Sequence, residues 1–115
     1  MNIINLTPHD ICILPQSGAE LRNQRIIPPS GTIARCDTEE VHCGTIDGIP
    51  VYHTTYGQVH GLPEPVKETV YIVSYVVARA LASSRHDLVI PAGFERDEKG
   101  NIIGCHAFSV LSQPQ

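Results

Sequence analysis

The chain has 115 residues, of which 42% are hydrophobic, 5% aromatic and only 17% charged. This length fits one domain with a single core, and a charged fraction below the usual level of about 25% disfavours extensive disorder. The net charge of −4 argues against bulk binding to DNA, RNA or acidic membranes, because those partners require basic patches.

The first third of the chain predicts short strands separated by turns. The segments Pro15-Gln16-Ser17-Gly18 and Pro28-Pro29-Ser30-Gly31 are both strong turn signals. Near the N-terminus, Thr7-Pro8-His9 separates two apolar segments. The strands expected in this part cover residues 3–6, 11–14, about 19–27 and 32–36.

Asp47-Gly48 is the clearest local signal in the sequence. It lies between two strand-like segments, 41–46 and 49–56, a pattern typical of a hairpin closed by a two-residue type I′ turn. Further on, residues 69–73 are almost continuously apolar, as expected of a central strand buried on both faces. The remaining elements expected are a helix over 74–84, a buried strand at 88–90 and a hairpin over 94–111 that turns at 98–101.

These elements predict one domain over residues 1–115 with an α+β fold. Its sheet is expected to be mostly antiparallel and built from β-hairpins, with one short helix at about 74–84 packed on it. The first residues lack the basic region of a secretory signal, and the longest strongly apolar stretch, 70–82, contains Arg79 and is too short to span a bilayer. We therefore expect a cytoplasmic protein.

The four cysteines form no CxxC motif, so neither a zinc ribbon nor a thioredoxin-type site is indicated. In a reducing compartment they are expected to be free thiols, mostly buried as small hydrophobic residues. The chain also lacks a Gly-rich phosphate loop, a GxSxG elbow and an HExxH motif. We expect no cofactor and no metal. The cysteines are Cys12, Cys36, Cys43 and Cys105.

The register of the Asp47-Gly48 hairpin brings together residues that could carry chemistry. Counted outward from the turn without a bulge, His42 faces His53 and Glu40 faces Thr55. Cross-strand partners have Cβ atoms about 5 Å apart, so these side chains would share one face. Two imidazoles and a carboxylate could form a facial metal triad or an acid/base pair. The plainer interpretation is a solvated face beside the apolar residues near the turn.

The junction of the expected central strand and helix predicts a phosphate site. Ser74 is placed to cap the helix, and a helix N-terminus offers free N–H groups and a positive dipole end. Tyr75 and Arg79 lie four residues apart on one helical face, so an aromatic ring and a guanidinium could flank a ligand. In the alternative, Ser74 only caps and Arg79 pairs with a carboxylate such as Glu64 or Glu68.

The basic residues are unbalanced, with six Arg and only two Lys. Arginine holds phosphate in a bidentate manner and stacks on bases, so an acidic protein can still bind a small phosphorylated ligand through a few arginines. Tyr56 or Tyr75 could stack a base, and His53 is a secondary candidate. The ligand-binding residues expected are Arg35, His53, Tyr56, Ser74, Tyr75, Arg79 and Arg96.

Ordered landmarks run along nearly the whole chain, and by them it resembles a family of small phage and prophage proteins. They are a family signature rather than the signature of an activity. The landmarks are Asn5-Leu6-Thr7-Pro8-His9, Pro29-Ser30-Gly31 through Ala34-Arg35, Gly48-Ile49-Pro50, Gly61-Leu62-Pro63-Glu64-Pro65, Tyr71-Ile72-Val73-Ser74, Asp87-Leu88 to Pro91, and Arg96-Asp97 to Gly104-Cys105.

Small acidic phage proteins without catalytic motifs include homo-oligomeric sponges that sequester nucleotide immune signals, such as the Thoeris and CBASS inhibitors. By this context the resemblance implies a non-enzymatic anti-defence protein in the host cytoplasm that binds a nucleotide-derived ligand. We expect a homo-oligomer with its site between subunits, because one domain of this size has little room for a deep pocket. The alternatives are a phosphodiesterase or other hydrolase using Glu40, His42 and His53, and a protein-binding or virion accessory module favoured by exposed apolar strands.

Overall fold

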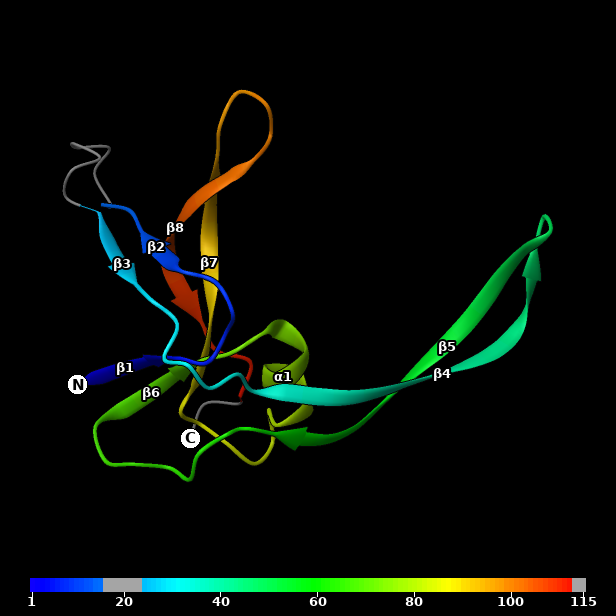
Figure 1. Cartoon of the computed structure of the whole chain (residues 1–115), viewed down its shortest axis with the longest axis horizontal. Coiled ribbons are helices and arrows are strands. Elements are labelled where there is room, and N and C mark those ends of the chain that lie inside the picture. The colour runs from blue at the N-terminus through cyan, green and yellow to red at the C-terminus, as the bar shows by residue number, and fades with distance from the viewer. Residues whose placement is uncertain (16–23, 113–115) are drawn as a thin grey trace.

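The computed structural model describes residues 1–15 and 24–112 and consists of a small β-rich body with a long hairpin arm (Figure 1). Six strands form one sheet in the order β1-β6-β7-β8-β2-β3, and the other two pair only with each other. The elements are β1 (Asn2–Asn5), β2 (Ile11–Ile13), β3 (Arg25–Ile27), β4 (Arg35–Ile46), β5 (Ile49–His60), β6 (Thr69–Ile72), α1 (Tyr75–Ala80), β7 (Leu88–Arg96) and β8 (Ile102–Ser109).

The pairing is mostly antiparallel, as the sequence predicts. The long β4–β5 and β7–β8 hairpins carry most of the ladders, and β2 pairs with β3 in the same sense. Parallel pairing is confined to β6, which lies between β1 and β7, and to a short contact of β2 with β8. With a single helix of six residues among the described ranges, the fold is better called β-rich than α+β.

Several predicted boundaries shift, and each shift has a local cause. The helix expected to reach residue 84 ends at Ala80, because the hydrogen bonds beyond it tighten to a spacing of three residues: the Ala82 N–H donates to the Arg79 carbonyl (3.4 Å) and the Ser84 N–H to the Leu81 carbonyl (3.1 Å). The strand expected at 88–90 continues through Pro91, whose missing N–H is tolerated because β6 has already ended beside Val89.

Two other predicted strands differ from the structure. The strand expected at 32–36 begins only at Arg35 and is the start of the long β4. The strand expected at about 19–27 is present over Arg25–Ile27. The rest of it, together with most of the turn predicted before it, lies outside the described residues.

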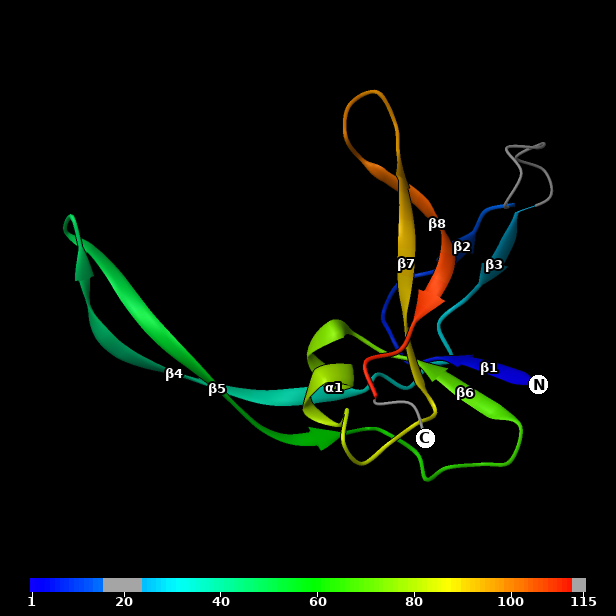
Figure 2. The same cartoon turned by 180° about the vertical axis from the view of Figure 1, so that it is seen from behind.

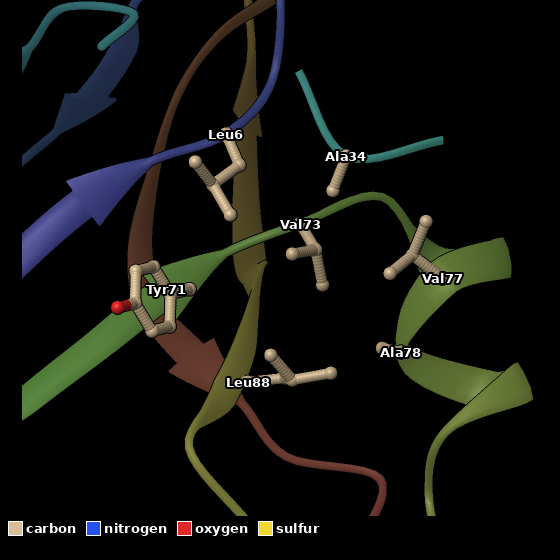
Figure 3. Packing of buried hydrophobic residues seen from close by; sticks show 7 residues of the cluster. All are labelled: Leu6, Ala34, Tyr71, Val73, Val77, Ala78 and Leu88. Atoms are coloured by element: carbon tan, nitrogen blue, oxygen red, sulfur yellow. The ribbon is translucent and has the colours of Figure 1, made fainter. Parts of the chain in front are cut away.

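The core is formed where α1 covers β6 and β7. Val77 and Ala78 of the helix face Val73 and Leu88 (Figure 3). A smaller cluster that includes Ile72 lies on the opposite face of the sheet. The main cluster comprises Leu6, Ala34, Tyr71, Val73, Val77, Ala78 and Leu88. The strand predicted over residues 69–73 is present as β6 over Thr69–Ile72, lies between β1 and β7, and is buried on both faces as predicted.

The side chain of Asn5, only 1% exposed, links the two edge strands of the sheet. Its Nδ2 donates to the carbonyls of His9 (2.7 Å) and Ile27 (3.0 Å), and its Oδ1 accepts from the backbone N–H (2.9 Å) and hydroxyl (2.7 Å) of Thr7. Since Asn5 ends β1 and Ile27 ends β3, this amide holds together the first and last strands in the sheet order.

A second polar cluster holds the Pro-rich crossing between β5 and β6. Arg85 donates from Nε and Nη2 to the two carboxylate oxygens of Asp87, both at 2.8 Å, and from Nη2 to the Pro63 carbonyl at 3.0 Å. The Tyr71 hydroxyl donates to the Glu64 carbonyl (3.2 Å). Both partners of the ion pair are largely buried, so the pair fixes the crossing against the core.

The β4–β5 hairpin projects from the body as an arm (Figures 1 and 2). Only at its base do Cys36 and Val59 pack against the core, and most of its other side chains are exposed. The radius of gyration is 16.9 Å, whereas a compact chain of this length has about 13 Å. The arm therefore accounts for an unusually extended shape.

Replacing Asn5 by Leu should destabilise the protein by about 2–5 kcal/mol, because it leaves the buried Ile27 carbonyl without its donor and also removes the part-buried bonds to His9 and Thr7. Urea denaturation measures the loss, and Asn2→Leu in the exposed first position of the same strand is the matched control. Equal midpoints for the two variants would contradict the role assigned to Asn5.

The ion pair predicts a defined acid dependence of stability. Hydrogen bonds from Arg85 are the largest cause that lowers the pKa of Asp87 below its ordinary value of 3.8. Because the folded pKa lies below the unfolded one, the carboxylate stabilises the fold above the unfolded pKa, and this contribution disappears as the pH falls through the folded pKa.

Asp87→Asn should therefore cost about 1–3 kcal/mol at pH 7 and progressively less as the pH falls below 4. Urea denaturation at a series of pH values measures the difference between the variant and the natural chain. A difference that stays constant down to pH 2.5 would contradict the assignment.

Candidate functional site

The most site-like feature is a hollow of about 190 Å³ where β5 passes α1. Tyr56 reaches it from the root half of β5, and Tyr75 and Arg79 reach it from the helix. Val76 and Ala80 complete its lining with apolar side chains. Three of the seven predicted ligand-binding residues therefore come together, although no sequence pattern connects Tyr56 with the helix.

Local helix geometry explains why Tyr75 and Arg79 face this hollow. Val77 and Ala78 are buried against the sheet, so the residues four apart on the other side, Tyr75 and Arg79, are left exposed. The predicted pairing of Arg79 with Glu64 or Glu68 is not formed. Within residues 1–15 and 24–112 the Arg79 guanidinium has no hydrogen bond or ion pair, so its donors remain available to a ligand.

Ser74 acts as the helix cap. Its hydroxyl accepts a hydrogen bond from the Val77 backbone N–H at 3.3 Å, so one of the free N–H groups expected to bind phosphate already has a partner. The helix itself has only six residues, and Ser74 does not line the hollow. This geometry agrees with the alternative in which Ser74 only caps the helix.

The remaining three predicted residues lie elsewhere. Arg35 opens β4 and pairs with His60 across the arm. His53 lies further along the arm opposite Val41. Arg96 ends β7, where its Nη1 donates to the Gly100 carbonyl (2.8 Å) and closes the β7–β8 turn. None of the three lines the hollow.

The arm has the predicted turn but not the predicted register. Asp47 and Gly48 have φ values of 51° and 77°, as a type I′ turn requires, and Gly44 pairs with Val51 as expected. A register shift between His42 and Gly44 then leaves Cys43 as an extra residue. The regular alternation assumed from the sequence stops at this bulge.

The bulge separates the predicted catalytic constellation. His42 faces Tyr52, with ring centroids 5.5 Å apart in an edge-on contact, while His53 faces Val41. Since successive strand residues point to opposite faces, Glu40 and His42 lie on one face and His53 on the other. The predicted shared face is therefore wrong, and the described part of the chain contains no cluster of three His, Cys, Asp or Glu suited to a metal.

The cysteines are free, as predicted, but they are less buried than predicted. Only Cys105 is buried, and its burial raises the pKa of the thiol, which disfavours the reactive thiolate. Cys43 is exposed because it occupies the bulge on the arm. The bulge could not be predicted from the sequence, because the alternation of polar and apolar residues does not reveal where one strand of a ladder gains a residue.

Comparison with protein-family models, curated proteins and solved structures finds no match for the chain. No helix in the described ranges is long and apolar enough to cross a membrane. The hollow must therefore be interpreted from its own residues.

The capping role of Ser74 is testable by substitution. Ser74→Ala should lower the free energy of unfolding by about 1 kcal/mol, whereas Ser74→Asp, which keeps a capping oxygen, should restore most of it. Thermal unfolding followed by circular dichroism measures both, with Ser83→Ala in the exposed turn after the helix as control. If Ser74→Ala unfolds at the same temperature as Ser83→Ala, Ser74 does not cap.

Proposed function

We propose that this protein binds a small nucleotide-derived ligand without converting it, and that as a phage protein it sequesters a bacterial immune signal. The observation that carries the proposal is the convergence of two exposed tyrosines and an unpaired guanidinium, all among the described residues, on one hollow. Arg79 would hold a phosphate, and Tyr56 and Tyr75 would stack on a base. The phage context rests on the landmark resemblance.

The charge around the hollow favours a ligand whose phosphate groups each carry a single negative charge. Asp37 and Glu39 line the adjoining surface on the other side of Tyr56, and Arg79 is the only cation among the residues lining the hollow. One guanidinium balances the single charge of a phosphodiester better than the double charge of a terminal phosphate. Cyclic nucleotides and pyrophosphate-linked nucleotides are therefore the preferred class.

The size of the hollow favours binding between subunits. Pockets that enclose drug-sized ligands measure about 300–1,000 Å³, whereas this one measures about 190 Å³. It can take a phosphate or a base but not a whole nucleotide. In the proposed homo-oligomer a second subunit covers the remainder of the ligand.

The two alternatives find unequal support. A hydrolase using Glu40, His42 and His53 requires these groups at one reaction centre, and the bulge points His53 away from the other two. A protein-binding or virion accessory module is favoured by the exposed arm, which bears several large apolar side chains.

The proposal predicts that a panel of cyclic dinucleotides, cyclic mononucleotides and ADP-ribose contains a ligand detectable by calorimetry. Arg79→Gln should weaken its affinity about tenfold to a hundredfold, because a hydrogen bond to a charged group contributes about 1.5–3 kcal/mol. Lys67→Gln, an equal change of charge in the exposed loop before β6, should leave affinity unchanged.

Mass spectrometry after heat denaturation separates binding from catalysis. Recovery of the intact ligand supports the sponge, and recovery of a hydrolysis product supports the hydrolase instead. Equal affinity of Arg79→Gln and the natural chain, or no ligand in the panel, would overturn the proposed site.

A further inference from the structure

We infer that the β4–β5 arm docks on the body of a second copy of this chain, in a reciprocal exchange between two subunits. The inference shares the homo-oligomer with the proposed function but does not depend on a ligand. An isolated two-stranded hairpin is at best marginally stable in water, and most side chains of the arm are exposed in its own chain.

One face of the arm tip is apolar. Ile46 and Ile49 are directly paired and are 68% and 65% exposed. Val51 and Val41 follow on the same face, opposite Gly44 and His53. Four branched aliphatic side chains thus line one side of the outer half of the arm, an arrangement that marks an interaction surface rather than a solvated hairpin.

The body carries a matching apolar surface beside β2 and the β7–β8 hairpin. A hollow of about 160 Å³ there is bordered by Ile11, Pro91, Phe94, Ile102 and Ile103. The last three are 51%, 50% and 44% exposed. The arm and the β7–β8 hairpin leave the body in different directions in both views (Figures 1 and 2), so this surface cannot be covered by the arm of the same chain.

Charge selects the body of another copy rather than its arm. Residues 35–60 contain Asp37, Glu39, Glu40 and Asp47, and Arg35 at the root is their only Lys or Arg. The arm therefore carries three of the four net negative charges of the chain, and the remainder carries one. Two arms repel each other more strongly than an arm repels a body.

The area of contact requires exchange in both directions. A strand of 12 residues is about 40 Å long and a pair of strands about 10 Å wide, so the whole of one arm face covers roughly 400 Å² and its apolar outer half roughly 200 Å². A one-way contact therefore buries about 400–800 Å² in total, the size of a crystal contact, while a reciprocal pair buries about 800–1,600 Å² and reaches the standard size of a stable interface when the full length of both arms is covered. Reciprocal exchange also closes the assembly as a two-fold dimer.

The dimer is tested by analytical ultracentrifugation without any nucleotide. The chain of 12.6 kDa should sediment as a dimer at micromolar concentration. Ile46→Asp places a charge in the apolar tip and should weaken dimerisation at least tenfold. Thr45→Asp is the matched control, because Thr45 lies one position away on the opposite face of the same arm. Both positions are exposed, and circular dichroism verifies that both variants fold.

A mixing experiment distinguishes arm-to-body exchange from pairing of two arms. Phe94→Lys on the receiving surface should also give monomers. Mixed with Ile46→Asp, it should form heterodimers, since one contact is then unaltered and the other joins Asp to Lys. A monomeric natural chain, dissociation by Thr45→Asp as readily as by Ile46→Asp, or failure of the mixture to associate would overturn the inference.

The same samples separate this inference from the proposed function. A dimer that Ile46→Asp dissociates, in a protein that binds no nucleotide, supports the exchange and refutes the sponge. A monomeric natural chain that binds a nucleotide through Arg79 refutes the exchange and supports nucleotide binding at the hollow.

Discussion

Asn5 holds the two edges of the sheet together through its side-chain amide, and its backbone holds the segment that leads to the arm. Besides joining β1 to β3, Asn5 accepts a backbone hydrogen bond from Ser30 (2.9 Å), and the neighbouring Leu6 carbonyl accepts one from Ala34 (3.0 Å). The segment between β3 and β4 is thereby held across the core, and β4 starts immediately after it at Arg35. The start of the arm is thereby placed by hydrogen bonds to Asn5 and Leu6.

Several of the sequence landmarks noted along the chain have structural roles. Asn5 and Ser30 form the contacts just described. Gly61 has a φ of 80°, and a Cβ added there would overlap the Ile33 carbonyl, so no larger residue fits. Pro63 accepts the hydrogen bond from Arg85. Such landmarks contribute to how the chain folds, and none of these contacts carries chemistry. The proposed site instead uses Tyr56, Tyr75 and Arg79, which lie outside them.

Sequence reasoning succeeded where the signal was local. Asp47-Gly48 specifies its turn because both residues accept positive φ, and the apolar run before Ser74 specifies a buried strand. It failed where the outcome depends on a partner strand or on distant packing. The bulge at Cys43 is a property of two strands together, so alternation within one strand could not locate it. The meeting of Tyr56 with α1 depends on the crossing held by Arg85, which no periodicity encodes.

Tyr56 belongs both to the root of the arm and to the hollow, and this shared position couples the two proposals. An arm held by a second subunit has less conformational freedom than a free one, so its tyrosine reaches the ligand at a lower entropic cost. By linkage, a ligand that binds the dimer more tightly must strengthen the dimer by the same factor. Ligand binding and dimerisation would then be thermodynamically coupled, and β5 is the strand through which each affects the other.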